Sequence, residues 1–180
     1  MNNFLFELIG TAFLILLGNG VVANVLLNKT NGHKSGWIVI TFGWAIAVFV
    51  GVYISAASSG AHLNPAVSIG LATAGKFSWA LVPVYIAAQF IGAMFGALLV
   101  WITYKKHFDE TEDAAAKLGT FCSSPAIPNA TFNVTTELIA TFVLVFGVLY
   151  ITGADVKLGS LDALPVALLI LGIGLSLGGP

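Results

Sequence analysis

A short polar segment, residues 59–67, interrupts a long apolar stretch and reads SGAHLNPAV. Asn64 followed by Pro65 predicts the start of a helix, because Asn accepts hydrogen bonds from the first amides and Pro suits the first helical position. The Asn64 NH2 group would then remain as an outward donor, beside the positive end of the helix dipole. A polar helix start between membrane spans is costly unless it lines a water-filled path. We therefore favour a passage for a small polar molecule over a capped segment that merely packs against protein.

The residues before Asn64 add acceptors to this site. A break in the helix leaves the carbonyl groups of Gly60, Ala61, His62 and Leu63 without helical partners. In a pore these groups would form a ladder of acceptors, and elsewhere they would need buried partners. The His62 side chain could gate the path or sense pH, but its position beside the short helix favours a hydrogen-bonded partner of that scaffold.

Two acids lie within apolar stretches, Glu7 and Glu137. Acids buried in a membrane are usually functional or structural rather than accidental. One hypothesis is a proton relay, and the other is a pin that accepts N–H groups from an irregular loop. We favour a pair of buried structural pins, because the chain offers no neighbouring ladder of titratable groups.

Other chemistries find little support in the residue types. His33, His62 and His107 lack the spacing of metal ligands, and Cys122 has no adjacent base. We expect no metal, no cofactor and no enzymatic activity. The chain carries a net charge of −1 and has no arginine, so nucleic acid is not an expected partner.

The composition predicts an all-α membrane protein. The chain is 58% hydrophobic and 8% charged, whereas soluble domains carry roughly 25% charge. A short run, residues 64–74, would extend about 16 Å as a helix, half of a bilayer, so we predict that it enters and returns. Five stretches are long enough to cross a bilayer, the last of them marginally: residues 4–27, 37–55, 79–104, 134–152 and 163–177.

The chain contains an internal repeat. The sequence FELIGT at residues 6–11 is echoed by TELIAT at 136–141, each at the start of an apolar stretch. Three spans per repeat would place the two halves in opposite orientations, which gives an inverted repeat. We expect a first repeat at 1–104, a connecting loop at 105–133 and an incomplete second repeat of two spans at 134–180.

Trp44 lies inside the second predicted span, between Gly43 and Ala45. Tryptophan near the end of a span usually belongs to the aromatic belt at the membrane interface. The same side chain could instead face the mouth of a pore and present an apolar wall to a carbon backbone. The residue type alone leaves both interpretations open.

Residues 59–67 resemble the first signature loop of the aquaporin (major intrinsic protein) family, and Glu7 and Glu137 match its paired first spans. The resemblance extends over residues 6–180. Trp44 stands where the bacterial glycerol facilitator (aquaglyceroporin) branch places the tryptophan of its narrow filter. The long loop, with GTF at 119–121, is also similar to that branch.

The resemblance implies a passive channel for glycerol and other small uncharged polyols, with some water permeation. Trp44 would form the apolar wall, the carbonyl groups of residues 60–63 the acceptor ladder, and Asn64, Pro65 and Ala66 the start of the half-helix at the midplane. It also implies a homotetramer with one pore per subunit, in a lipid bilayer that is expected to be a bacterial plasma membrane. The alternatives are a water-selective aquaporin, a transporter coupled to ions through Glu7 or Glu137, and a non-conducting fragment.

The chain departs from the family pattern at its C-terminal end. The family filter combines a tryptophan, a second aromatic residue and an arginine that follows a second Asn-Pro-Ala motif. This sequence contains neither that motif nor any arginine. The departure predicts a fragment of a longer channel that does not necessarily conduct on its own.

Overall fold

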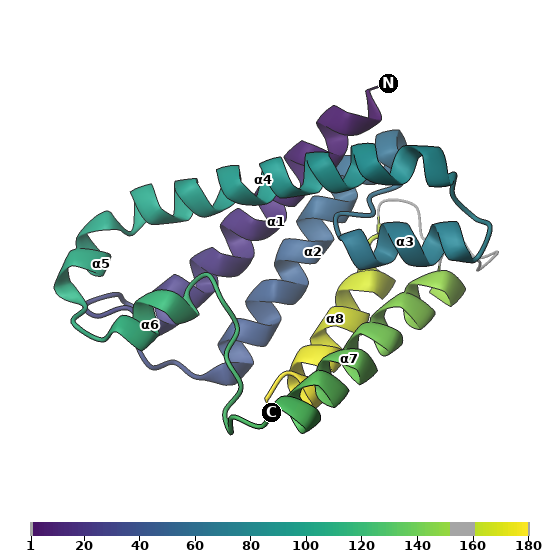
Figure 1. The fold of residues 1–180 in the computed structure, drawn as a ribbon. Helices are drawn as coiled ribbons and strands as arrows, with labels where there is room; N and C mark the ends of the chain where they lie inside the picture. Colours follow the sequence, from purple (N-terminus) through teal and green to yellow (C-terminus); the bar gives the residue numbers. More distant parts are fainter. Residues whose placement is uncertain (1, 152–160, 180) are drawn as a thin grey trace.

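The computed structural model describes residues 2–151 and 161–179, and within them it contains helices and loops but no strand (Figure 1). The all-α prediction is confirmed. The helices are α1 (Asn3–Leu26), α2 (Trp37–Ser59), α3 (Pro65–Thr73), the 3-10 turn η1 (Trp79–Leu81), α4 (Val82–Thr103), α5 (Lys105–Glu110), α6 (Ala114–Gly119), α7 (Ala130–Ile151) and α8 (Leu164–Leu177).

Four helical segments are long and apolar enough to cross a membrane: Asn3–Leu26, Trp37–Ser59, Trp79–Thr103 and Ala130–Ile151. The fifth predicted span forms α8, whose 14 residues extend about 21 Å, less than the ~30 Å of a hydrocarbon core. The second predicted span was too short, because α2 continues past residue 55 to Ser59. Ser55 does not end α2, because its hydroxyl has a hydrogen-bond partner on α1. It donates to the Phe6 carbonyl at 2.9 Å.

The half-helix predicted at 64–74 is present as α3, which has 9 residues and a length of about 14 Å. Asn64 caps its first turn by accepting a hydrogen bond from the Ala66 amide at 2.8 Å. Gly75 has a positive φ of 70°, which lets the chain reverse at the end of the helix. The Lys76 amide then donates to the Leu71 carbonyl at 2.9 Å, the bond expected of a glycine-terminated helix.

The segment 105–133 was predicted to be a loop, and this prediction is wrong in part because α5 and α6 form within it. The two short helices fold back onto the end of α1, where Phe108 is buried against Ala23, Leu27 and Val100. An exposed ion pair between Lys29 and Glu110 lies beside this contact, and the Lys29 hydrogen bond lowers the pKa of the Glu110 carboxyl. The division of the chain into two repeats at this segment stays a prediction.

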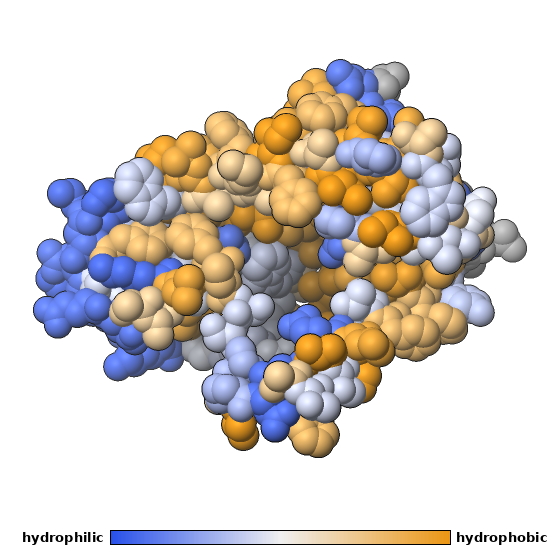
Figure 2. All heavy atoms as spheres, in the orientation of Figure 1, coloured by the Kyte–Doolittle hydropathy of each residue, from blue (hydrophilic) through white to orange (hydrophobic). Residues whose placement is uncertain are grey.

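The helices form one layered bundle. α1 packs against α2 on one side and α4 on the other, α8 packs against α2 and α7, and α3 lies between α4 and α7 (Figure 1). Apolar side chains cover much of the face shown in Figure 2, whereas hydrophilic ones gather around α5. Ile38, Phe90 and Met94 are among the exposed large apolar residues. Such a surface suits a lipid environment, as the composition predicted.

Glycines let α1 and α4 approach closely. A Cβ atom added at Gly92 would overlap the Leu8 carbonyl oxygen and lie 3.1 Å from its carbon, and one at Gly96 would overlap the Ala12 carbonyl oxygen. We expect Gly92→Ala to destabilise the protein by about 2 kcal/mol, because backbone atoms cannot move aside as side chains do. Thermal unfolding in detergent measures the effect. Gly172→Ala is the matched control, since its Cβ would meet nothing within 4 Å, and equal losses in the two variants would contradict the packing argument.

Candidate functional site

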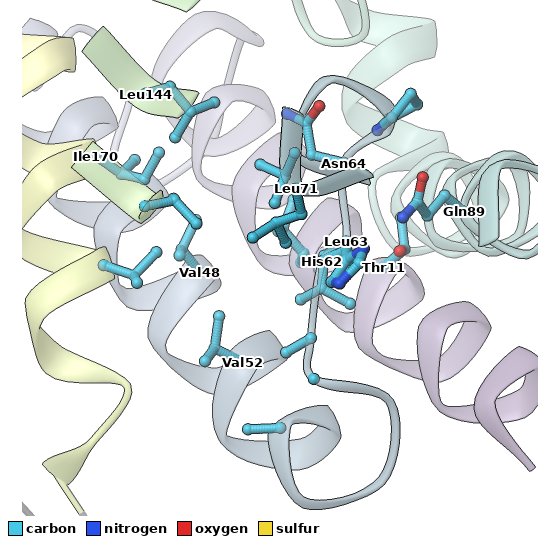
Figure 3. A pocket seen from close by; sticks show the side chains of 18 of the residues that line it. Thr11, Val48, Val52, His62, Leu63, Asn64, Leu71, Gln89, Leu144 and Ile170 are labelled. Atoms are coloured by element: carbon cyan, nitrogen blue, oxygen red, sulfur yellow. The ribbon is translucent and has the colours of Figure 1, made fainter. Parts of the chain in front are cut away.

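A cavity of about 850 Å³ lies between the half-helix and the longer helices (Figure 3). Side chains from α1, α2, α3, α4, α7 and α8 contribute to its wall. The structure therefore brings the predicted pore residues together in one place, although their role in permeation stays a prediction. The predicted residues at this wall are Trp44, Gly60, Ala61, His62, Leu63, Asn64 and Pro65.

The loop between α2 and α3 has an unusual backbone. Gly60, Ala61 and Leu63 have φ values of 82°, 52° and 50°, a region that residues other than glycine rarely adopt. The amide of His62 donates to Glu7 Oε1 at 2.9 Å, and that of Leu63 donates to Glu7 Oε2 at 2.8 Å. The amides of His62 and Leu63 therefore point toward the Glu7 carboxylate. No hydrogen bond from the described residues reaches the carbonyl oxygens of residues 60–63, which leaves these oxygens available as acceptors.

Glu7 holds the loop in this conformation. Its side chain is completely buried, with 0% exposure, and each carboxylate oxygen accepts two hydrogen bonds. The Ser59 hydroxyl at 2.7 Å joins the His62 amide on Oε1, and the Gln89 amide at 2.8 Å joins the Leu63 amide on Oε2. All four partners are donors, so the site is built for an ionised carboxylate. This is the geometry of a pin that joins α1, α2 and α4 to the loop.

His62 lies within the scaffold beside this pin. Its Nδ1 atom is 3.0 Å from the Ser68 hydroxyl, and its ring packs against Phe77 and Tyr85 with centroid distances of 4.5 and 4.8 Å. The Tyr85 hydroxyl donates to the Ser59 carbonyl at 2.7 Å. His62 therefore helps to attach α3 to α4, which is the scaffold role favoured from the sequence.

Sequence reasoning missed three polar members of this network, Gln89, Tyr85 and Ser68. Gln89 donates both to Glu7 and to the Ser68 hydroxyl, the latter at 3.1 Å, and it also borders the cavity. A signal existed, because Gln89 is an isolated amide within an apolar stretch, and buried polar groups require partners. Its partners come from α1 and α3, which are distant in the sequence.

Glu137 does not occupy an equivalent buried site, so the prediction of a second buried acid is wrong for this structure. Glu137 is exposed on α7. The physical reason is that no irregular loop among the described residues covers its face of α7, whereas the loop after α2 covers Glu7. The local sequences around the two acids are alike, but their tertiary surroundings differ.

The cavity combines a polar strip with an apolar wall. The Asn64 oxygen is used by the cap, and its NH2 group donates to no residue in the described part of the chain. Ala66, the second residue of α3, is not among the residues at the cavity wall. Val48, Val52, Leu144 and Ile170 provide apolar surface (Figure 3). One strip can therefore donate and accept hydrogen bonds, while another contacts carbon.

The polar groups at the cavity wall determine which contacts a solute can make there. Within residues 2–151 and 161–179, no group of three or more histidine, cysteine, aspartate or glutamate side chains is arranged to hold a metal ion. The polar residues at the wall supply amides, carbonyls and a hydroxyl, and they include the titratable residues His62 and Asp162. These groups can exchange hydrogen bonds with a neutral solute.

Comparison with known proteins gives consistent matches. The family model described as Major intrinsic protein matches residues 1–179. The probable glycerol uptake facilitator protein of Thermotoga maritima is 53% identical over 180 residues, which are 100% of this chain and 76% of that protein. The glycerol uptake facilitator protein of Bacillus subtilis is 50% identical, over 99% of this chain and 65% of its own length. Among solved structures, the aquaglyceroporin from Plasmodium falciparum matches with a TM-score of 0.88 and 35% identity, over 98% of this chain and 72% of that one.

Proposed function

The chain belongs to the major intrinsic protein family, and on this premise we propose that it forms a passive transmembrane channel for glycerol and other small uncharged polyols, with some water permeation. The observation that carries the proposal is the cavity wall, to which residues 60–63 and Asn64 contribute beside apolar side chains. The carbonyl oxygens of residues 60–63 accept no hydrogen bond from the described residues, and the Asn64 NH2 group donates none to them. Relatives named glycerol uptake facilitators support the choice of substrate.

The mechanism follows from the chemistry of glycerol. Each hydroxyl group must lose water to enter a narrow path, and the acceptors of residues 60–63 and the donor of Asn64 would replace those hydrogen bonds. The carbon backbone of the solute would lie against Trp44 and the aliphatic side chains. Because α3 points the positive end of its dipole at the same place, cations would be repelled.

The geometry of Glu7 favours passive permeation over ion coupling. A coupling acid must exchange its proton or ion during transport. Glu7 is buried and saturated by four donors, so releasing it would break the contacts that hold the loop. We infer no coupled transport and no enzymatic activity.

The cellular location and the oligomeric state of the protein are part of the same proposal. Exposed apolar side chains on α2 and α4 support a multi-pass protein, and the bacterial relatives support a bacterial plasma membrane. We also propose a homotetramer, with one path in each subunit. Crosslinking in the membrane followed by mass measurement tests the assembly.

Solute flux into proteoliposomes tests the function. We expect glycerol permeability well above that of protein-free liposomes, proportional to the glycerol gradient and unchanged when a pH gradient is imposed or collapsed. Stopped-flow light scattering measures glycerol and water permeability on the same preparation. Flux that saturates and follows the pH gradient would indicate a coupled transporter, and water flux without glycerol flux would indicate a water-selective channel. No flux above the liposome background would refute the proposal.

A further inference from the structure

The indole of Trp44 rests directly on Gly18 of α1. A Cβ atom added at Gly18 would lie 2.5 Å from Trp44 Cε3 and 2.7 Å from Cη2, and closer still to Cζ3. Gly18 is buried, and the indole is its contact on the α2 side. Trp44 also borders the cavity. The space that a side chain at position 18 would fill is therefore the space that the ring occupies.

The two helices cannot separate to make room for a larger residue. A Cβ atom at Gly43 would lie 2.5 Å from Val21, so α1 and α2 are already close next to Trp44. Near the other end, a Cβ atom at Gly10 would overlap the Ser55 hydroxyl, and one at Gly51 would lie 3.0 Å from the Gly10 carbonyl oxygen. Contacts on both sides of Gly18 thus hold the distance between the helices.

A methyl group at position 18 must therefore displace the ring. Carbon atoms pack at about 3.5–4.0 Å, so the indole would have to move by about 1 Å. The open direction is the cavity, because Val21, Val22 and Ile40 pack with Trp44 in the cluster on the protein side. A ring that moves in this direction narrows the path beside it.

We infer that Gly18 is a specificity-determining residue: the absence of a side chain there holds the Trp44 indole back and sets the width available to the carbon backbone of a permeating polyol. The inference rests on the proposed function. A narrower path excludes glycerol before it excludes water, since water is smaller. Gly18 thus belongs to the selectivity of the path although the ring, and not the glycine, meets the solute.

The test compares Gly18→Ala with Gly20→Ala in proteoliposomes. Both changes add one methyl group to α1, but a Cβ atom at Gly20 would meet nothing within 4 Å. We expect Gly18→Ala to lower the ratio of glycerol to water permeability roughly ten-fold, the scale of one methylene group in a fitted pocket. Gly20→Ala should keep the wild-type ratio. Trp44→Phe and the double variant G18A/W44F complete the set, and the smaller ring should remove most of the effect of the methyl group.

The outcomes separate the inference from the function. If the wild-type protein passes no glycerol, the proposed function and this inference both fall. If the wild type passes glycerol and Gly18→Ala keeps its ratio, the inference alone is overturned. If Gly18→Ala does not yield folded protein, the double variant G18A/W44F decides. A folded double variant with the glycerol-to-water permeability ratio of Trp44→Phe supports the contact between position 18 and the indole. A double variant that also fails to fold overturns the inference.

Discussion

Replacing Glu7 with glutamine is expected to destabilise the folded, permeable state strongly. The amide oxygen of glutamine can keep two of the four hydrogen bonds, but its NH2 group would face the two remaining donors. A buried donor without an acceptor costs about 1–3 kcal/mol, so the expected loss is about 2–6 kcal/mol. The melting temperature of the detergent-solubilised protein should fall by roughly 10 °C.

Thermal unfolding followed by size-exclusion chromatography measures this loss. Glu137→Gln is the matched control, because it makes the same chemical change at an exposed position of the other repeat-like segment. The control should change the free energy of unfolding by no more than about 0.5 kcal/mol. A Glu7→Gln protein that melts with the wild type and passes glycerol normally would show that the carboxylate does not hold the loop.

Replacing Asn64 with aspartate is expected to separate the two roles of this side chain. Aspartate keeps an oxygen for the Ala66 amide and favours the N-terminus of α3, so the half-helix should remain folded. The outward NH2 donor is replaced by an acceptor with negative charge. We expect glycerol permeability to fall about ten-fold or more, because one lost hydrogen bond is worth about 1–1.5 kcal/mol and the charge adds to it.

Stopped-flow measurements of glycerol flux, together with a proton-sensitive dye inside the liposomes, test this prediction. Asn64→Ala is the comparison variant, since it removes both the cap and the donor and should also lower stability by about 1 kcal/mol. Aspartate should keep the stability and lose the glycerol flux. Wild-type glycerol flux through Asn64→Asp would exclude Asn64 as a donor to the solute.

Local signals in the sequence determined several elements. The composition and length of the apolar stretches predicted helices α1, α2, α4 and α7 as spans. Asn64 with Pro65 predicted the start of α3. These signals are local because capping and backbone conformation depend on residues within one helical turn.

The tertiary structure alone decided which polar residues meet. Glu7 and Glu137 lie in similar local sequences, yet one is completely buried and the other is exposed, because only Glu7 has the loop after α2 against it. Gln89 reaches Glu7 across 82 positions of the chain. Burial and hydrogen bonding depend on which helices become neighbours, and no local pattern records that.

The contact between Gly18 and Trp44 is likewise decided by the tertiary structure and not by the local sequence. The residue type and position of Trp44 left open whether it belongs to the interface belt or to a pore, and Gly18 showed no feature of its own in the sequence. The packing of α1 against α2 places the ring on the glycine and beside the cavity. The sequence by itself thus determined the helices, their half-length member and the polar residues available, whereas the width and lining of the path depend on distances between helices, which only the packed bundle sets.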